Sequence, residues 1–345
     1  MSSDDIDPAS LFYNTSFNLH KVTPLNLNGS FASPSNLKSY STRLTNVLRG
    51  DVLRGVRVAD PTEADATSRT GNLNRVEFSV IQIPGSDREL EAIAAIFRFE
   101  KITYSAYLVR NSSPDAEAQI GASSSRRASL RSAATQTNQT NYYPLLLTRT
   151  PGWLQSRFIE FLTENFDCHV SNLRLPGGFI MSAVEQHLDR CLPPGSAIAS
   201  LSKNIQLSLE PPQLPVKDGQ DAQKPAKLQT LKTISMTFLR TDIPGMMHKG
   251  RELKSKEEEG GLREERGPFE LALSLYAYEH MGMLIEKLKV QRATCGEFIM
   301  GVTADGSGKC KFFPPEPVAD IERSTGSERP KSWDGLVRSL VELAT

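Results

Sequence analysis

Residues 93–109 read IAAIFRFEKITYSAYLV, two apolar runs that alternate with polar residues. In the first run Phe97 and Phe99 alternate with charged residues, and in the second Tyr104 and Leu108 share one side. Successive side chains of a β-strand point to opposite faces, so each run predicts a strand with one buried face. The two runs lie close enough in sequence to form a hairpin, which is typical of an antiparallel sheet.

Further strands are predicted on both sides of this hairpin. Each is a short segment in which Val, Ile, Leu or aromatic residues recur at every second position, or in which apolar residues form a brief continuous run. The predicted strands are 11–19, 51–58, 73–83 and 143–147.

Three helices are predicted in the same half of the chain. The first begins at Ser33-Pro34, an N-cap residue followed by a first-turn proline, and ends at Gly50. Its apolar residues recur at three- and four-residue steps and therefore share one face. The apolar face consists of Leu37, Tyr40, Leu44, Val47 and Leu48, and the other two helices are 150–162 and 178–191.

The second half of the chain combines strands with two further helices. Residues 269–281 alternate in part, but their length and their Ala, Leu and Glu content favour a helix. Residues 284–302 form one long strand, or two strands broken at Gly296, and Asp305–Gly308 form a hairpin turn. The other predicted elements are strands at 205–209, 234–238 and 309–313 and a helix at 333–344.

These elements predict an α+β fold with a large, curved, mostly antiparallel sheet, packed helices and disordered inserted loops. Residues 111–141 are almost entirely Ser, Ala, Thr, Gln, Asn and Arg, and such a segment buries too little apolar area to become ordered. We therefore expect a disordered N-terminus at 1–10, an N-terminal α+β region at 11–192 and a β-rich C-terminal region at 193–345. Flexible loops are expected at 211–227 and 249–266.

The composition bounds the function classes. The chain has 40 Lys and Arg residues against 40 Asp and Glu residues, so it exerts no overall electrostatic attraction on DNA or on an anionic membrane. Met1–Asp7 is polar and acidic, unlike a signal or transit peptide, and no apolar run approaches the ~20 residues of a membrane helix. The four cysteines contain no C-x-x-C pair, and we expect reduced thiols in an intracellular protein.

The sequence carries few marks of catalysis or metal binding. His187 and Cys191 lie one helical turn apart, and Cys168 and His169 add two more potential zinc ligands. Structural zinc sites usually use closely spaced ligand pairs on a tight turn, so a packed cysteine with partly solvated histidines is favoured and no metal or cofactor is expected. No G-x-S-x-G, H-E-x-x-H or phosphate-loop motif is present. A catalytic site assembled from distant residues stays open, but the absence of local motifs favours a protein that is not an enzyme.

One motif suggests regulation. Arg126 and Arg127 precede Ser129 by three and two positions in the Ser- and Arg-rich segment, a pattern that a kinase with an acidic groove recognises. Phosphate at Ser129 would add about −1.5 to −2 charges beside two arginines. The alternative is an unmodified pair of arginines.

Four phrases of the sequence resemble a known family. They are LFYNTSFNLHKVTPL at 11–25, GDVLRGVRV at 50–58, LLLTR at 145–149 and TCGEFIMG at 294–301. In this order and at this spacing they resemble the fungal branch of the centromere protein L family. The resemblance extends from Leu11 to about Phe313 and is specific through the joint occurrence of these phrases.

The resemblance implies a subunit of the constitutive inner-kinetochore network, in the nucleus at centromeres. Family members form a heterodimer with centromere protein N, which recognises nucleosomes that contain the centromeric histone H3 variant. The resemblance also implies a large curved sheet, distantly similar to a ring-shaped bacterial DNA-binding protein, and no catalytic residue. We therefore expect a centromere protein N-like partner, other inner-kinetochore subunits and indirect contact with centromeric nucleosomes and DNA.

The predicted partner-binding region is the C-terminal group of strands. An uncovered strand edge exposes backbone N–H and C=O groups and can pair with a strand of another chain. The alternative is that these strands lie in the middle of this chain's own sheet. The expected partner-binding residues are Leu284, Lys287, Lys289, Gln291, Phe298, Met300 and Phe312.

Direct contact with DNA is a separate hypothesis. A self-sufficient DNA-binding protein is the alternative function, although a net charge of zero argues against it. Isolated basic residues on strands are most often part of a solvated face. The expected DNA-facing residues are Arg54, Arg57, Lys203, Lys232 and Lys309.

Overall fold

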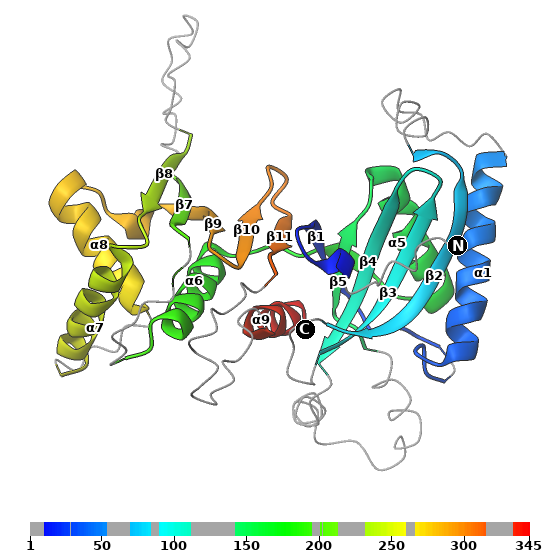
Figure 1. The fold of residues 1–345 in the computed structure, drawn as a ribbon, viewed down its shortest axis with the longest axis horizontal. Coiled ribbons are helices and arrows are strands. Elements are labelled where there is room, and N and C mark those ends of the chain that lie inside the picture. The colour runs from blue at the N-terminus through cyan, green and yellow to red at the C-terminus, as the bar shows by residue number, and fades with distance from the viewer. Residues whose placement is uncertain are drawn as a thin grey trace, which may run out of the picture. The chain divides into compact units, whose positions relative to one another are not determined.

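The computed structural model of the chain describes residues 10–27, 29–53, 70–83, 90–111, 142–194, 201, 203–212, 232–259, 266–314 and 334–345. Together these residues form six α-helices and eleven strands, and the strand pairs within each unit are antiparallel, which confirms the α+β class (Figure 1). The chain divides into two compact units, Met1–Arg174 with Ser307–Thr345, and Leu175–Gly306. The boundary that we expected after residue 192 lies within the second unit.

The first unit contains the hairpin that the sequence predicted. β3 (Leu90–Phe99) pairs antiparallel with β4 (Thr103–Asn111), with Ala95 opposite Ala106. The strands follow each other across the sheet in the order β2 (Leu73–Gln82), β3, β4, β5 (Leu145–Arg149), β1 (Ser16–Val22) and β11 (Gly308–Phe312). The short β6 (Val170–Asn172) also pairs with β1.

The central strands of the first unit are buried on both faces, and the expectation of one buried face is wrong for them. On one face, helices α1 (Pro34–Leu53) and α5 (Gly152–Phe166) share a core with β2, β3 and β4. On the other face, Phe12, Phe17 and Tyr107 form an aromatic cluster with ring centroids 5.5–5.6 Å apart, and helix α9 (Asp334–Ala344) contacts β4 and β5. The sequence shows alternation only at the ends of these strands.

The second unit places helices against a smaller sheet. Its strand order is β10 (Phe298–Val302), β9 (Lys289–Thr294), β7 (Ile205–Glu210) and β8 (Ile234–Phe238). Helix α6 (Gly177–Cys191) packs on β9 so closely that a Cβ atom at Gly177 would lie 3.2 Å from the Val290 nitrogen. Helices α7 (Ile243–Glu259) and α8 (Pro268–Met281) lie against each other, and the Glu185 carboxylate of α6 accepts the Glu270 N–H at the first turn of α8.

Several boundaries differ from the sequence predictions. The predicted strand at 11–19 begins only at Ser16 and is preceded by a 3-10 helix, Ser10–Phe12. Helix α1 continues past Gly50, so residues 51–53 of the predicted strand at 51–58 are helical and the rest of that segment lies outside the described residues. Val47 is 42% exposed and does not belong to the buried face of α1.

The charged segment at 249–266 is not a loop throughout, because residues 249–259 belong to α7. Its Glu, Lys and Arg residues are good helix formers, and Lys249 pairs with Glu252 at i,i+3 across 3.6 Å. Residues 284–302 form two strands, as one of our two alternatives had it, with a 3-10 turn at Ile285–Lys287 before them. Of the predicted disordered segment at 111–141, Asn111 is the last residue of β4, and residues 112–141 lie outside the described residues.

Candidate interaction surface

Strand edges are the feature of this fold that another chain could use. Among the described residues, β2 pairs only with β3, and β8 pairs only with β7. Each of these strands therefore has one side on which its backbone N–H and C=O groups lack a strand neighbour. The two edges differ in what covers them.

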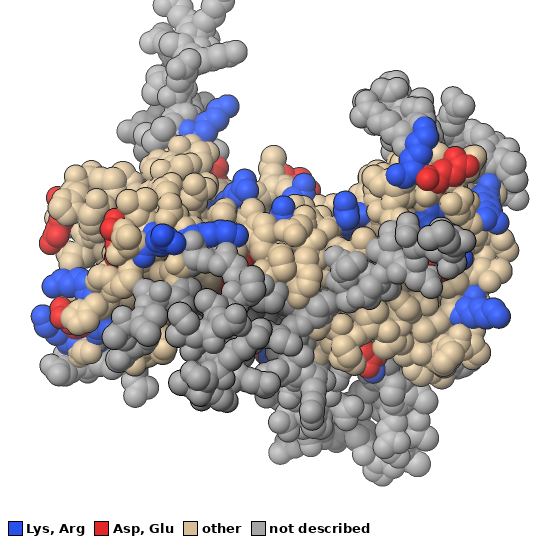
Figure 2. All heavy atoms as spheres, in the orientation of Figure 1, with Lys and Arg blue, Asp and Glu red and all other residues tan. Residues whose placement is uncertain are grey.

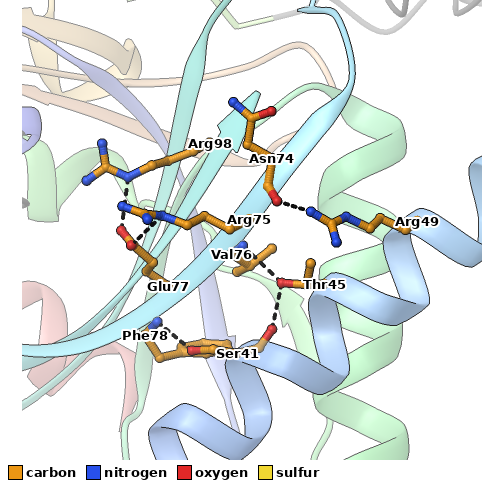
Figure 3. Close-up of polar contacts among 9 residues, drawn as sticks. All are labelled: Ser41, Thr45, Arg49, Asn74, Arg75, Val76, Glu77, Phe78 and Arg98. Carbon is orange, nitrogen blue, oxygen red and sulfur yellow. Dashed lines mark hydrogen bonds and ion pairs between the residues drawn. The ribbon is translucent and has the colours of Figure 1, made fainter. Parts of the chain in front are cut away.

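Helix α1 covers the edge of β2 through side-chain hydroxyls (Figure 3). The Val76 N–H donates to Thr45 Oγ1 across 3.0 Å, and the Phe78 N–H donates to Ser41 Oγ across 2.9 Å. Each hydroxyl in turn donates to a carbonyl of its own helix, Ser41 to Leu37 and Thr45 to Ser41. The helix thus accepts the edge hydrogen bonds that a neighbouring strand would otherwise accept.

Arg49 extends this cover to the carbonyl groups of the same edge. Its guanidinium donates to the carbonyl oxygens of Leu73 and Asn74. Glu77 of β2 forms ion pairs with Arg75 of the same strand at 2.6 Å and with Arg98 of β3 at 2.9 Å (Figure 3). An edge whose donors and acceptors are already satisfied is a poor template for a further strand.

No comparable cover lies on β8. Within the part of the chain that the structure describes, no side chain is hydrogen-bonded to the backbone of Ile234–Phe238. Ser235 and Thr237 are exposed, Ile234 and Met236 are half-buried, and Phe238 is buried against the Phe269 ring at 5.3 Å. As far as the described residues show, the edge of β8 is therefore open and its apolar side chains are only partly covered.

Exposed apolar side chains gather in the same unit. Eight large apolar side chains are exposed among the described residues, and five of them belong to residues 239–284. Monomeric proteins expose single apolar residues routinely, whereas a contiguous group of them marks a surface that another molecule covers. The five are Leu239, which follows β8, and Tyr276, Tyr278, Met281 and Leu284, which lie on and just after α8.

A comparison with protein families identifies the chain at this point. The family described as centromere protein L matches residues 11–345. The chain belongs to the centromere protein L family. No curated protein matches the sequence.

Membership of the centromere protein L family makes this chain a kinetochore subunit, located in the nucleus at the centromere of the chromosome. The family consists of structural kinetochore proteins that take part in chromosome segregation, and it implies other inner-kinetochore proteins as partners. Surfaces for other proteins, rather than a catalytic centre, are therefore the features of interest.

The predicted partner-binding residues of this centromere protein L member separate into two groups. Leu284, Lys287 and Lys289 are exposed, and the half-buried Gln291 donates a hydrogen bond to Glu210. Strand β9, which carries Lys289 and Gln291, pairs with β7 on one side and β10 on the other, so it is an inner strand. The side chains of the second group are fully buried in the core: Phe298, Met300 and Phe312.

The predicted DNA-facing residues are scattered over the chain. Lys203 and Lys232 are exposed in the second unit, Lys309 is exposed on β11 of the first unit, and Arg54 and Arg57 lie outside the described residues. On the face drawn in Figure 2, lysine and arginine side chains lie scattered among uncharged surface. The DNA-facing role of these residues stays a prediction, as does phosphorylation of Ser129, which lies outside the described residues.

The two cysteine–histidine pairs belong to different units. Cys168 and His169 belong to the first unit, whereas His187 and Cys191 belong to the second. Over the described residues, no three or more His, Cys, Asp and Glu side chains are arranged to hold a metal ion. Among the described helices, none combines the length and apolar character that a membrane crossing requires.

Sequence reasoning missed the two features that define the open edge. It identified β8 as a strand but not as an edge, because an edge depends on which strands pair across the whole fold. The exposed apolar residues carried a visible signal. Tyr278 and Met281 lie three positions apart and share one side of the helix, whereas Tyr276 lies on another, and a helix that is apolar all round needs cover on every side.

Proposed function

We propose that this member of the centromere protein L family forms a heterodimer with a centromere protein N-like subunit, and that the pair helps to anchor the kinetochore on centromeric nucleosomes. The observation that carries the proposal is the open edge of β8, together with the exposed apolar side chains of the same unit. A strand of the partner adds to this edge by backbone hydrogen bonds.

The size of a stable interface explains why the strand edge alone is insufficient. Specific interfaces bury about 1,600 Å² in total, and a five-residue strand offers only part of that area. Leu239, Tyr276 and Tyr278 add apolar and aromatic side chains, the kinds that contribute most to binding at interface centres. Leu284 and Lys287, which the sequence had already suggested, extend the same proposed surface.

Two neighbouring proline variants test the use of the edge. Successive N–H groups along a strand point to opposite sides, so of Met236→Pro and Thr237→Pro, one removes a hydrogen bond to β7 and the other removes only an outward N–H. We expect the variant that loses a hydrogen bond to β7 to have a lower melting temperature. We expect the variant that loses only an outward N–H to stay folded and to capture the recombinant partner subunit at least tenfold more weakly.

A side-chain variant tests the apolar part of the surface without altering the backbone. Leu239→Ser with Tyr278→Ser should also weaken capture at least tenfold, because both side chains are more than half exposed in the chain alone and would be buried in the pair. The matched control is Val80→Ser, which removes an apolar side chain of β2 that is 41% exposed. Unchanged capture by the folded proline and serine variants would place the interface elsewhere.

A further inference from the structure

The end of helix α6 brings a cysteine, a histidine and a glutamate together within the second unit. Cys191 Sγ lies 3.8 Å from His187 Nε2 and 3.9 Å from Nδ1, one helical turn earlier. His187 Nδ1 lies 3.2 Å from the Glu297 Oε2 atom, which belongs to the turn between β9 and β10. The three side chains form a chain of contacts from thiol to imidazole to carboxylate, and they do not converge on one point as metal ligands would.

The imidazole is held in one orientation. His187 is 3% exposed, and its ring meets the Phe298 ring edge-on with centroids 5.9 Å apart. Glu297 accepts from Nδ1, and the thiol sulfur lies at nearly the same distance from both ring nitrogens. Burial alone would lower the pKa of His187, but its bonds with Cys191 and Glu297 raise that pKa to about 9. The ring therefore carries a positive charge at neutral pH.

Cys191 differs from the other cysteines in its surroundings. Cys168, Cys295 and Cys310 are at most 3% exposed, and burial raises the pKa of each of these thiols, to about 11 for Cys168. Cys191 is partly exposed and has the charged imidazole beside it. A neighbouring imidazolium stabilises a thiolate, and an accessible thiolate is the form of cysteine that attacks electrophiles.

We propose that Cys191 is a peroxide-sensitive modification site, with His187 as the proton donor and Glu297 as a positioning residue. The Cys191 sulfur, as the thiolate, attacks one oxygen of hydrogen peroxide. The sulfur–oxygen bond forms as the oxygen–oxygen bond breaks, and the sulfur is oxidised to sulfenic acid while the peroxide is reduced. The departing hydroxide takes the proton of the imidazolium and leaves as water, so the products on the protein are a sulfenic acid and a neutral histidine.

The proposal does not depend on the heterodimer and is tested on the full chain alone. The protein is treated with hydrogen peroxide in the presence of dimedone, a nucleophile that traps sulfenic acids, and each cysteine peptide is quantified by mass spectrometry over time. We expect Cys191 to be labelled at least tenfold faster than the three buried cysteines and tenfold faster than glutathione at pH 7. Labelling of Cys191 at the glutathione rate or slower would overturn the proposal.

Variants separate the histidine's action on the thiol from its packing in the core. His187→Gln should lower the labelling rate at least tenfold and shift its pH dependence toward that of glutathione, which loss of packing alone would not do. Glu297→Gln should produce a smaller decrease, and because that side chain lies partly at the surface it decides the question if His187→Gln unfolds the second unit. Asp189→Asn, on the same helix but bound to Arg251, is the matched control and should change nothing. Unchanged rates in His187→Gln or Glu297→Gln, with the fold intact by circular dichroism, would overturn the assignment.

Discussion

β2 and β8 each pair with one neighbouring strand among the described residues, yet side chains cover the unpaired side of β2 and not that of β8. The β2 edge donates to Ser41 and Thr45 of a packed helix, whereas no described side chain is hydrogen-bonded to the backbone of β8. Natural sheets protect edges that must not pair and leave uncovered those that bind a partner. The difference indicates that the edge of β8, rather than that of β2, is available for pairing with another chain. The following experiments test this difference.

The largest effect is expected where the cover of β2 is removed. Ser41→Ala with Thr45→Val leaves the N–H groups of Val76 and Phe78 without acceptors at a largely buried site. A buried unsatisfied donor costs about 1–3 kcal/mol, so the double variant should lose about 2–6 kcal/mol of unfolding free energy. Urea denaturation measures the loss, and light scattering should detect association through the unprotected edge.

Thr42→Val is the control for that variant. The Thr42 hydroxyl donates only to Lys38 of its own helix and faces solvent, so its removal should change stability by less than about 0.5 kcal/mol. Equal stabilities for the control and the double variant would mean that the hydroxyls do not protect the edge.

A smaller effect is expected at the contact between α7 and α8, which supports the open-edge unit. A Cβ atom at Gly250 would lie 1.7 Å from the Pro268 carbonyl oxygen, so Gly250→Ala must push the helices apart. Overpacking of this kind costs about 1–3 kcal/mol and should weaken partner capture as α8 shifts. Gly245→Ala on the same helix meets no atom within 4 Å and should be neutral or stabilising. A stable Gly250→Ala variant with normal capture would show that the position of α8 is irrelevant to binding.

A separate effect, which needs no substitution, is a difference in how the two units respond to pH. Burial raises the pKa of Glu185 to about 7, and His187 has a pKa of about 9, so the folded second unit holds protons that the unfolded chain releases. Its stability should therefore fall as pH rises, from about 4.5 to 7 through Glu185 and from about 6.5 to 9 through His187. Each group contributes at most about 1.4 kcal/mol per pH unit.

The first unit should respond in the opposite direction through His20. Burial lowers the pKa of this histidine, so the unfolded chain binds the proton more readily and the first unit loses stability as pH falls below about 6.5. Hydrogen exchange, corrected for intrinsic rates, resolves peptides of the two units in the intact chain. Glu185→Gln and His187→Gln should flatten the response of the second unit only, and parallel responses of both units would contradict the assignment.

The sequence predicted those elements whose pattern is local. The apolar stripe Leu154, Phe158, Phe161 and Leu162 predicted α5, and all four side chains are buried. Strict alternation predicted β7, whose Ile205, Leu207 and Leu209 are buried. In both cases one face of the element packs against one core, so the spacing of apolar residues in the sequence matches the spacing of buried residues in the fold.

Elements that depend on distant residues were not predictable in the same way. The charged helix α7 has only a short apolar stripe, Ile243 and Met247, and its close contact with α8 is made at the small Gly250. The cover of β2 depends on hydroxyls more than 30 positions away, and the open edge of β8 depends on the pairing of all other strands. The candidate surface followed from the sequence only in part, through Leu284 and Lys287.

Strand β1 pairs with β11, a strand almost 300 positions later in the sequence. Ser16 lies opposite Lys311 and Phe17 opposite Cys310 in the first unit, while residues 175–306 form the second unit between them. A ribosome therefore releases the whole second unit before β11 exists, and domains generally fold as units during synthesis. The β11 side of β1 therefore stays without its strand neighbour until residue 312 has been synthesised, which makes completion of the first unit a later event than synthesis of the second.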